Sequence, residues 1–239
     1  MRTHFIKLLG ITTLTLAIAS CGGGGSSAPS STTAPATVVS ISPDGVVASG
    51  SPYALSIKGV NFVNGMTISV TNKNGNSYFV SPAVVTSSTV ITANATIPTV
   101  PTDNYVNVSI KSSTGATLGT VTLGVASAAR TLAADVYPIL DAKCRSCHTG
   151  AANGNLDFAT YATTASANTT GLIGIPSSGC SQKYRVAVGD ARRTSSVLID
   201  KISASGTPCS GTLMPPTGST ALTSTEIQTI IDWVAGGAN

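Results

Sequence analysis

Two thiols and an imidazole lie within five consecutive residues, Cys144-Arg145-Ser146-Cys147-His148. Two cysteines separated by two residues can each add to one of two neighbouring vinyl groups of a porphyrin. The imidazole of the next residue then lies under the central iron. This C-x-x-C-H spacing is the signature of covalent haem attachment. The sequence therefore predicts one haem c, bonded to Cys144 and Cys147, with His148 as an iron ligand.

Two other uses of Cys144 and Cys147 compete with haem. A thioredoxin-like redox pair follows a strand and opens a helix, whereas these cysteines follow an apparent helix over residues 133–143. A zinc site would need Cys180 and Cys209 as further ligands, and the chain has no second C-x-x-C knuckle. Haem attachment therefore explains the motif better than either alternative.

The second iron ligand is expected from a methionine. His4 lies in the expected leader, so His148 is the only histidine left after export, and only Met66 and Met214 remain beside it. Met66 belongs to the β-rich half, whereas Met214 precedes two prolines, which stiffen its loop. Methionine and histidine together raise the reduction potential of haem iron and suit electron transfer. The alternative is that Met214 fills the core and the iron is five-coordinate or bound by a lysine.

Counting the five cysteines predicts a disulfide. Cys21 is expected to carry lipid, and Cys144 and Cys147 to carry haem, which leaves Cys180 and Cys209. Two leftover thiols in an oxidising compartment most simply pair, and closing a loop of this length stabilises the fold by about 3 kcal/mol. Two free buried thiols are the alternative.

The first residues of the chain are typical of an export signal. Arg2 and Lys7 precede an apolar run over residues 8–19, which is too short to span a bilayer comfortably. Small residues follow this run, as they do in secretory signal peptides. We therefore expect residues 1–20 to be a lipoprotein signal peptide that is removed.

The end of this leader, Ile18-Ala19-Ser20-Cys21, resembles a bacterial lipobox, in which the cysteine becomes the lipid-bearing first residue. Ordinary cleavage nearby, which leaves Cys21 free, is the alternative. Several acyl chains on one residue anchor a protein firmly, and residues 21–36 then form a flexible Gly/Ser/Pro tether. Gly22 stands where inner-membrane lipoproteins carry Asp. We expect an exported protein, lipid-anchored in the cell envelope at the outer membrane, on its periplasmic or surface face.

Residues 37–126 lack helical periodicity and contain seven short β-type runs separated by turns such as Asn64-Gly65. Strands at this spacing are typical of an antiparallel β-sandwich. The segment contains Ile41-Ser42-Pro43, Asn61-Phe62 and Tyr105-Val106-Asn107-Val108. In these residues it is similar to IPT/TIG immunoglobulin-like domains, which implies a spacer or interaction module. The seven runs cover residues 38–42, 54–58, 67–71, 77–81, 89–96, 105–111 and 117–125.

Two helices are expected to frame the C-x-x-C-H motif. The first covers residues 133–143, and Pro138 fits only in its first turn. The last begins at the capping box Thr223-Ser224-Thr225-Glu226, carries an apolar stripe and ends at Gly236-Gly237. Trp233, the only tryptophan, is expected in the core.

The order of these pieces resembles class I cytochrome c, and more narrowly the planctomycete-type cytochrome c-like domains. The resemblance implies an all-helical haem fold in which His148 is the proximal and Met214 the distal iron ligand. It is weakest over residues 160–174, where those domains have a compact Gly-rich element. The matching pieces are residues 140–144 and 154–158, Val188-Gly189-Asp190, Ser196-Val197-Leu198, Met214-Pro215-Pro216 and residues 231–238. The expected fold class is therefore an N-terminal all-β immunoglobulin-like sandwich, residues 37–126, and a C-terminal all-α cytochrome c fold, residues 127–239.

The amino-acid composition narrows the classes of partner that the protein could bind. The 239 residues are 42% hydrophobic but only 9% charged, with a net charge of +4, which argues against a nucleic-acid partner. We expect a membrane-anchored monohaem cytochrome that carries electrons between redox proteins, and not an enzyme. A haem-based ligand sensor and an adhesion or scaffold lipoprotein are the alternatives. Weak peroxidase activity would depend on Arg192 or Arg193.

Overall fold

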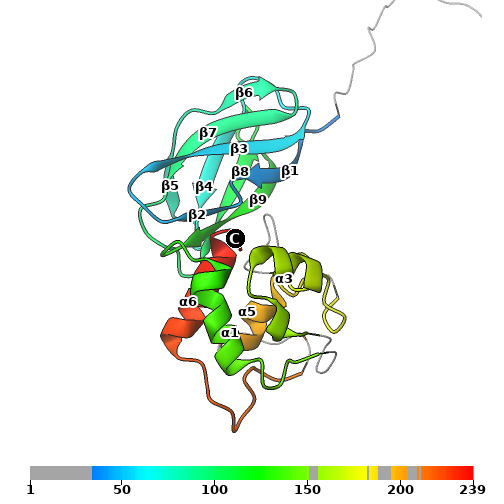
Figure 1. Ribbon diagram of the computed structural model, residues 1–239. Helices are drawn as coiled ribbons and strands as arrows, with labels where there is room; N and C mark the ends of the chain where they lie inside the picture. Colours follow the sequence, from blue (N-terminus) through cyan, green and yellow to red (C-terminus); the bar gives the residue numbers. More distant parts are fainter. Residues whose placement is uncertain are drawn as a thin grey trace, which may run out of the picture. The chain divides into compact units, whose positions relative to one another are not determined.

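The computed structural model describes residues 34–150, 156–181, 183–187, 195–203, 209 and 211–238 (Figure 1). Residues 34–239 form one compact unit. Several sequence predictions lie outside the described residues: the signal peptide, the lipidation residue Cys21, most of the tether, Val188-Gly189-Asp190, and Arg192 and Arg193.

Nine strands are described, and they include all seven that the sequence predicted. In the long strands buried residues alternate with less buried ones. In β8, Val106, Val108 and Ile110 are buried and the residues between them are half-buried. The two strands that were not predicted, β2 and β6, have three and four residues. The strands are β1 (Thr37–Ser42), β2 (Gly45–Val47), β3 (Pro52–Val60), β4 (Thr67–Thr71), β5 (Ser77–Val80), β6 (Val84–Ser87), β7 (Val90–Thr96), β8 (Tyr105–Lys111) and β9 (Thr117–Ala126).

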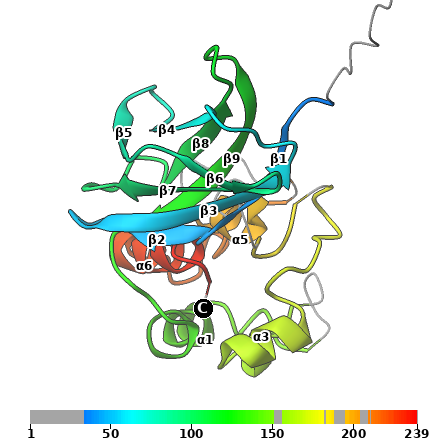
Figure 2. The same cartoon turned by 90° about the horizontal axis from the view of Figure 1, so that it is seen from above.

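The strands form a nearly closed sheet in the order β1-β3-β7-β5-β4-β8-β9-β2, with β6 paired to β7 (Figure 2). All pairs are antiparallel except β2 with β9, which run parallel in the register Gly45↔Gly124. Inward-facing residues such as Leu55, Ile91 and Leu123 are buried in a core of their own. Met66 is buried in this core, immediately before β4.

Six helical segments are described after β9, and they surround a second core that contains Trp233. None of the described helices is long and apolar enough to cross a bilayer. The predicted first helix is present but divided, because Pro138 has no N–H to donate and a π-helical turn precedes the α-helix that begins at Tyr137. The segments are η1 (Leu132–Val136), α1 (Tyr137–Lys143), η2 (Phe158–Thr160), α3 (Thr164–Thr170), α5 (Val197–Ile202) and α6 (Ser224–Ala235).

The predicted last helix agrees closely with α6. Thr223 Oγ1 accepts the N–H of Glu226, and a Glu226 carboxylate oxygen accepts the N–H of Thr223 at 2.7 Å, which completes the capping box. These bonds lower the pKa of the Glu226 carboxyl below its usual value. Ile230, Ile231 and Val234 are buried, as the apolar stripe predicted.

The expected fold class is wrong. The described residues form a single mostly β unit with a few short helices, and no all-α cytochrome c domain is present in it. Between α1 and α6 the chain is rich in Gly, Ser, Thr and Pro, which disfavour long helices. Short helices and isolated bridges, such as Ile173 with Val186 and Tyr184 with Ser196, take their place. The β part is likewise not a separate seven-stranded sandwich, since its sheet has nine strands and packs against α6.

Two glycines let the sheet approach α6. A Cβ atom on Gly45 or on its partner Gly124 would overlap the carbonyl oxygen of Ala235, near the end of α6. Close beside them, the buried carboxylate of Asp232 accepts the N–H of Ser127 at 2.9 Å and the Ser127 hydroxyl at 2.5 Å. Close packing and charge-assisted hydrogen bonds therefore join the sheet to the last helix.

We expect Asp232→Ala to lower the free energy of unfolding by about 2 kcal/mol, because it removes hydrogen bonds to a buried carboxylate. Urea denaturation of the purified protein measures the loss. The matched control is Asp103→Ala, which removes an exposed ion pair with Lys73 and should change the same free energy by less than about 1 kcal/mol. Equal losses in the two variants would contradict this role for Asp232.

Candidate functional site

The C-x-x-C-H motif forms a tight turn at the end of α1. The N–H groups of Cys144 and Arg145 both donate to the carbonyl of Leu140, at 2.9 and 3.0 Å. The N–H groups of Cys147 and His148 both donate to the carbonyl of Cys144, at 3.2 and 3.0 Å. Because these bonds continue the helical winding, they bring the two cysteines and the histidine onto one compact turn.

Two aromatic rings support the imidazole of His148. The ring of Phe158 meets the imidazole edge-on, with 5.4 Å between ring centroids, and the N–H of Phe158 donates to the His148 carbonyl at 2.9 Å. Tyr161 packs edge-on against Phe158 in turn, and both rings are buried. Edge-to-face contacts of this kind are favourable, so they restrict the orientation of the His148 ring.

One cavity of about 500 Å³ brings together the four residues that the sequence singled out for haem: Cys144, Cys147, His148 and Met214. They come from two segments far apart in the chain, the end of α1 and the loop before α6. Half of the other lining residues are apolar, and α5 supplies part of the wall. These apolar residues are Leu156, Phe158, Leu172, Val197, Leu198, Ile202, Pro215 and Pro216.

Met214 lies half-buried in the loop between Cys209 and α6. Its N–H donates to the carbonyl of Lys201 at 2.7 Å, and Lys201 lies near the end of α5. Met66, the other methionine that the sequence offered as a candidate ligand, is buried in the sheet core. The structure therefore brings Met214, and not Met66, to the cavity that holds His148.

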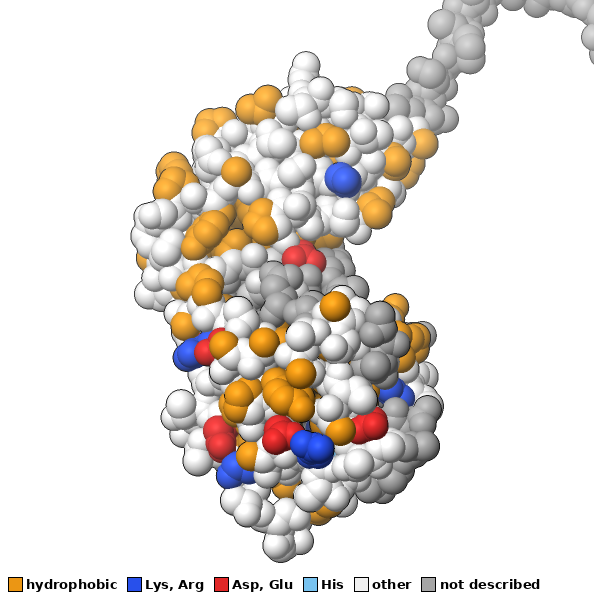
Figure 3. All heavy atoms as spheres, in the orientation of Figure 1, with side chains coloured by type: hydrophobic (Ala, Val, Ile, Leu, Met, Phe, Trp, Pro, Cys, Tyr) orange, Lys and Arg blue, Asp and Glu red, His pale blue; other side chains and the backbone are white. Residues whose placement is uncertain are grey.

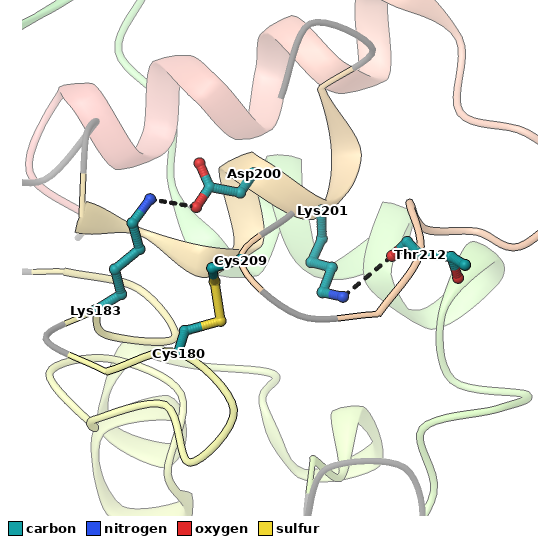
Figure 4. The surroundings of a disulfide bond; sticks show 6 residues. All are labelled: Cys180, Lys183, Asp200, Lys201, Cys209 and Thr212. Atoms are coloured by element: carbon teal, nitrogen blue, oxygen red, sulfur yellow. Dashed lines mark hydrogen bonds and ion pairs between the residues drawn. A yellow bond between two sulfur atoms is a disulfide. The ribbon is translucent and has the colours of Figure 1, made fainter. Parts of the chain in front are cut away.

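The structure contains a disulfide between Cys180 and Cys209, the pairing that the cysteine count predicted (Figure 4). The two Cα atoms are 5.6 Å apart, and Cys180 also lines the cavity. Cys180 and Cys209 are therefore unavailable as zinc ligands. No group of three or more His, Cys, Asp or Glu side chains suited to a metal ion occurs in the described part of the chain.

Three cationic side chains line the cavity, and the sequence analysis had assigned none of them to a site. They are Lys143 at the end of α1, Arg185 in the bridged segment and Lys201 on α5. Arg185 donates to the carbonyl of Gly171 at 2.6 Å, and Lys143 donates to the carbonyl of Ala221 at 3.3 Å. Among the described residues that line the cavity none is Asp or Glu, and the Glu226 carboxylate lies 3.8 Å from the Lys143 ammonium. On the face in Figure 3 the charged side chains gather mainly on the helical part.

Neither cysteine of the motif is in a disulfide, and their surroundings differ. Cys144 is half-buried against the second core, and Cys147 is exposed. Burial, with a smaller contribution from the neighbouring charge of Cys147, raises the pKa of the Cys144 thiol to about 11. At neutral pH Cys144 is therefore a protonated thiol in the absence of a bonded partner.

Comparisons with known proteins supply no family. No protein-family model matches the chain, and no curated protein matches it. One similar solved structure is that of the Lin-41 filamin domain, with a TM-score of 0.30 and 8% identity, covering 39% of this chain and 93% of that one. A likeness at this level supports no inference about function.

In the haem-free protein we expect iodoacetamide to alkylate Cys147 before Cys144. At about pH 8 Cys144 should react at least about tenfold more slowly, since few of its thiols are ionised and the side chain is half-buried. The Cys144 rate should then rise as the pH approaches 11. Peptide mass spectrometry over a pH series measures both rates, and the same protein in urea is the control. Similar rates for the two cysteines in the folded protein at about pH 8 would contradict the buried position of Cys144.

Proposed function

We propose that this protein is an exported, membrane-anchored monohaem c-type cytochrome that carries electrons between redox partners in the cell envelope. One observation carries the proposal: Cys144, Cys147, His148 and Met214 line the same cavity. Cys144, Cys147 and His148 are identified by their spacing, and Met214 by elimination among the remaining methionines. The three residues chosen by spacing and the methionine chosen by elimination therefore line one cavity, although the two choices were made independently.

The chemistry of the cavity fits a haem. Its volume of about 500 Å³ falls within the range of about 300–1,000 Å³ that is usual for ligand sites, and its apolar lining suits a porphyrin. Neither Cys144 nor Cys147 is in a disulfide, so both thiols could form thioether bonds. Lys143, Arg185 and Lys201 supply positive charge, and no described lining residue is Asp or Glu, which suits the two propionate groups of a haem.

In this proposal the side chains hold and shield the cofactor and do not react with a substrate. Cys144 and Cys147 would bond the haem, and His148 and Met214 would coordinate its iron, a ligand pair suited to electron transfer. When bound, the haem supplies one-electron chemistry. Phe158 restricts the rotation of the His148 ring, and apolar residues of α5 help exclude water from the cavity.

The proposed location rests on the leader and on the disulfide. Cys21 would carry the lipid, and residues 21–36 would hold the folded part away from the membrane, with the outer membrane as the proposed site. The Cys180–Cys209 disulfide supports an oxidising compartment, because disulfides persist mainly in exported proteins. The proposed partners are other redox proteins that donate and accept single electrons.

We expect the protein to be red and to carry covalent haem when it is produced in a host with a working cytochrome-maturation system. Cys144→Ala with Cys147→Ala should abolish covalent haem, because the two thioether bonds cannot form. The denatured haem spectrum in alkaline pyridine measures attachment. An equal amount of covalent haem in this double variant would contradict the proposal.

We expect Met214→Leu to keep the haem but to lose the Met–iron charge-transfer band of the ferric form. The midpoint potential should fall by at least about 0.1 V, within the range of about 0.8 V that axial ligands control. The matched control is Met66→Leu, which changes the sheet core and should leave band and potential unchanged. An unchanged band in Met214→Leu would exclude Met214 as the ligand. Rapid carbon monoxide binding by the reduced unaltered protein would favour a ligand sensor instead.

A further inference from the structure

Lys201 contacts the loop that carries Met214 through both its side chain and its main chain. The Lys201 ammonium donates to the carbonyl of Thr212 at 3.1 Å (Figure 4). The Lys201 carbonyl accepts the N–H of Met214 at 2.7 Å. A Cβ atom placed on Gly211 would lie 3.3 Å from the ammonium, so the lysine side chain also packs against the start of this loop. Lys201 of α5 thus lies against the loop at Gly211, Thr212 and Met214.

The helix that carries Lys201 is itself well anchored. Ile199 and Ile202 are buried in the second core. Asp200 forms an ion pair with Lys183, with 2.6 Å between Asp200 Oδ2 and Lys183 Nζ. In Figure 4 Lys183 and Lys201 lie on opposite sides of the Cys180–Cys209 disulfide. The disulfide holds the chain at Cys209, and the two hydrogen bonds of Lys201 connect Thr212 and Met214, further along the loop, to α5.

We propose that Lys201 is a positioning residue that holds Met214 at the cavity for iron ligation, an inference that rests on the proposed function. A methionine thioether is a weak ligand, and a loop that is already ordered loses less conformational entropy when the ligand binds. Lys201 orders the loop at residues that follow Cys209 and does not itself touch the iron. The residue therefore sets how fully Met214 occupies the distal position.

The spectroscopic test compares Lys201→Leu with Lys201→Arg in the haem-loaded protein. Lys201→Leu should weaken the Met–iron charge-transfer band and increase the carbon monoxide affinity of the reduced form by about fivefold, the factor expected for one lost hydrogen bond. Lys201→Arg keeps a long cationic donor and should restore both values. Lys73→Leu is the control: it removes an exposed ion pair to Asp103 in the β part of the protein and should leave the band unchanged. If Lys201→Leu does not mature, Lys201→Gln replaces it under the same criteria.

A second test needs no haem. Hydrogen exchange of the Met214 amide in the haem-free protein should be about fivefold faster in Lys201→Leu than in the unaltered protein or Lys201→Arg. Faster exchange in a protein that never takes up haem would sustain the ordering role and overturn the proposed function. A full charge-transfer band and unchanged exchange in Lys201→Leu would overturn the positioning role and leave the proposed function standing.

Discussion

Four backbone hydrogen bonds at the end of α1 determine where the reactive groups lie. The carbonyls of Leu140 and Cys144 each accept two N–H groups, which winds the C-x-x-C-H motif into one turn beyond the helix. Cys144 and His148 then face the same cavity as Met214. The remaining features of the site support this turn: Phe158 and Tyr161 pack beside His148, and α5 with the disulfide forms the opposite wall. Without the turn, the cavity would be only an apolar hollow with a cationic wall.

The sheet and the helices have separate cores but belong to one unit. Gly45 and Gly124 allow the closest contact, against the carbonyl of Ala235, and Asp232 adds hydrogen bonds to Ser127. The same helix, α6, buries Trp233 in the core on which α1 also packs. The sheet therefore helps to hold α6, and α6 in turn helps to hold the helix that presents the motif.

Features encoded by neighbouring residues could be predicted from the sequence. Alternation located seven of the nine described strands, and Thr223 with Glu226 located the start of α6, because each pattern acts within a few residues. β6 was not predicted because most of its four residues are exposed, and β2 because it has only three residues and pairs with the distant strand β9. The fold class was predicted wrongly because the resemblance between residues 132 and 239 was taken to imply an all-helical domain, whereas the described residues between α1 and α6 form short helices and isolated bridges.

Some residues of the candidate site could also be predicted from the sequence, and others could not. Cys144, Cys147 and His148 were predicted from their spacing. Met214 was predicted by eliminating the other methionines, and the Cys180–Cys209 pair by counting the cysteines. Arg185 and Lys201 could not be predicted, since nothing near them in the sequence indicates a cavity. Their role depends on how α5 and the bridged segment fold back toward α1, and this is set by tertiary packing.

The central claim is that a porphyrin is bonded to the two cysteines of the turn after α1. The most direct measurement is mass spectrometry of the proteolytic peptide that spans residues 144–148, taken from protein matured in a haem-attaching host. The account predicts that this peptide carries the mass of one haem, with both cysteines resistant to alkylation. A peptide of unmodified mass, whose two cysteines both alkylate, would contradict it.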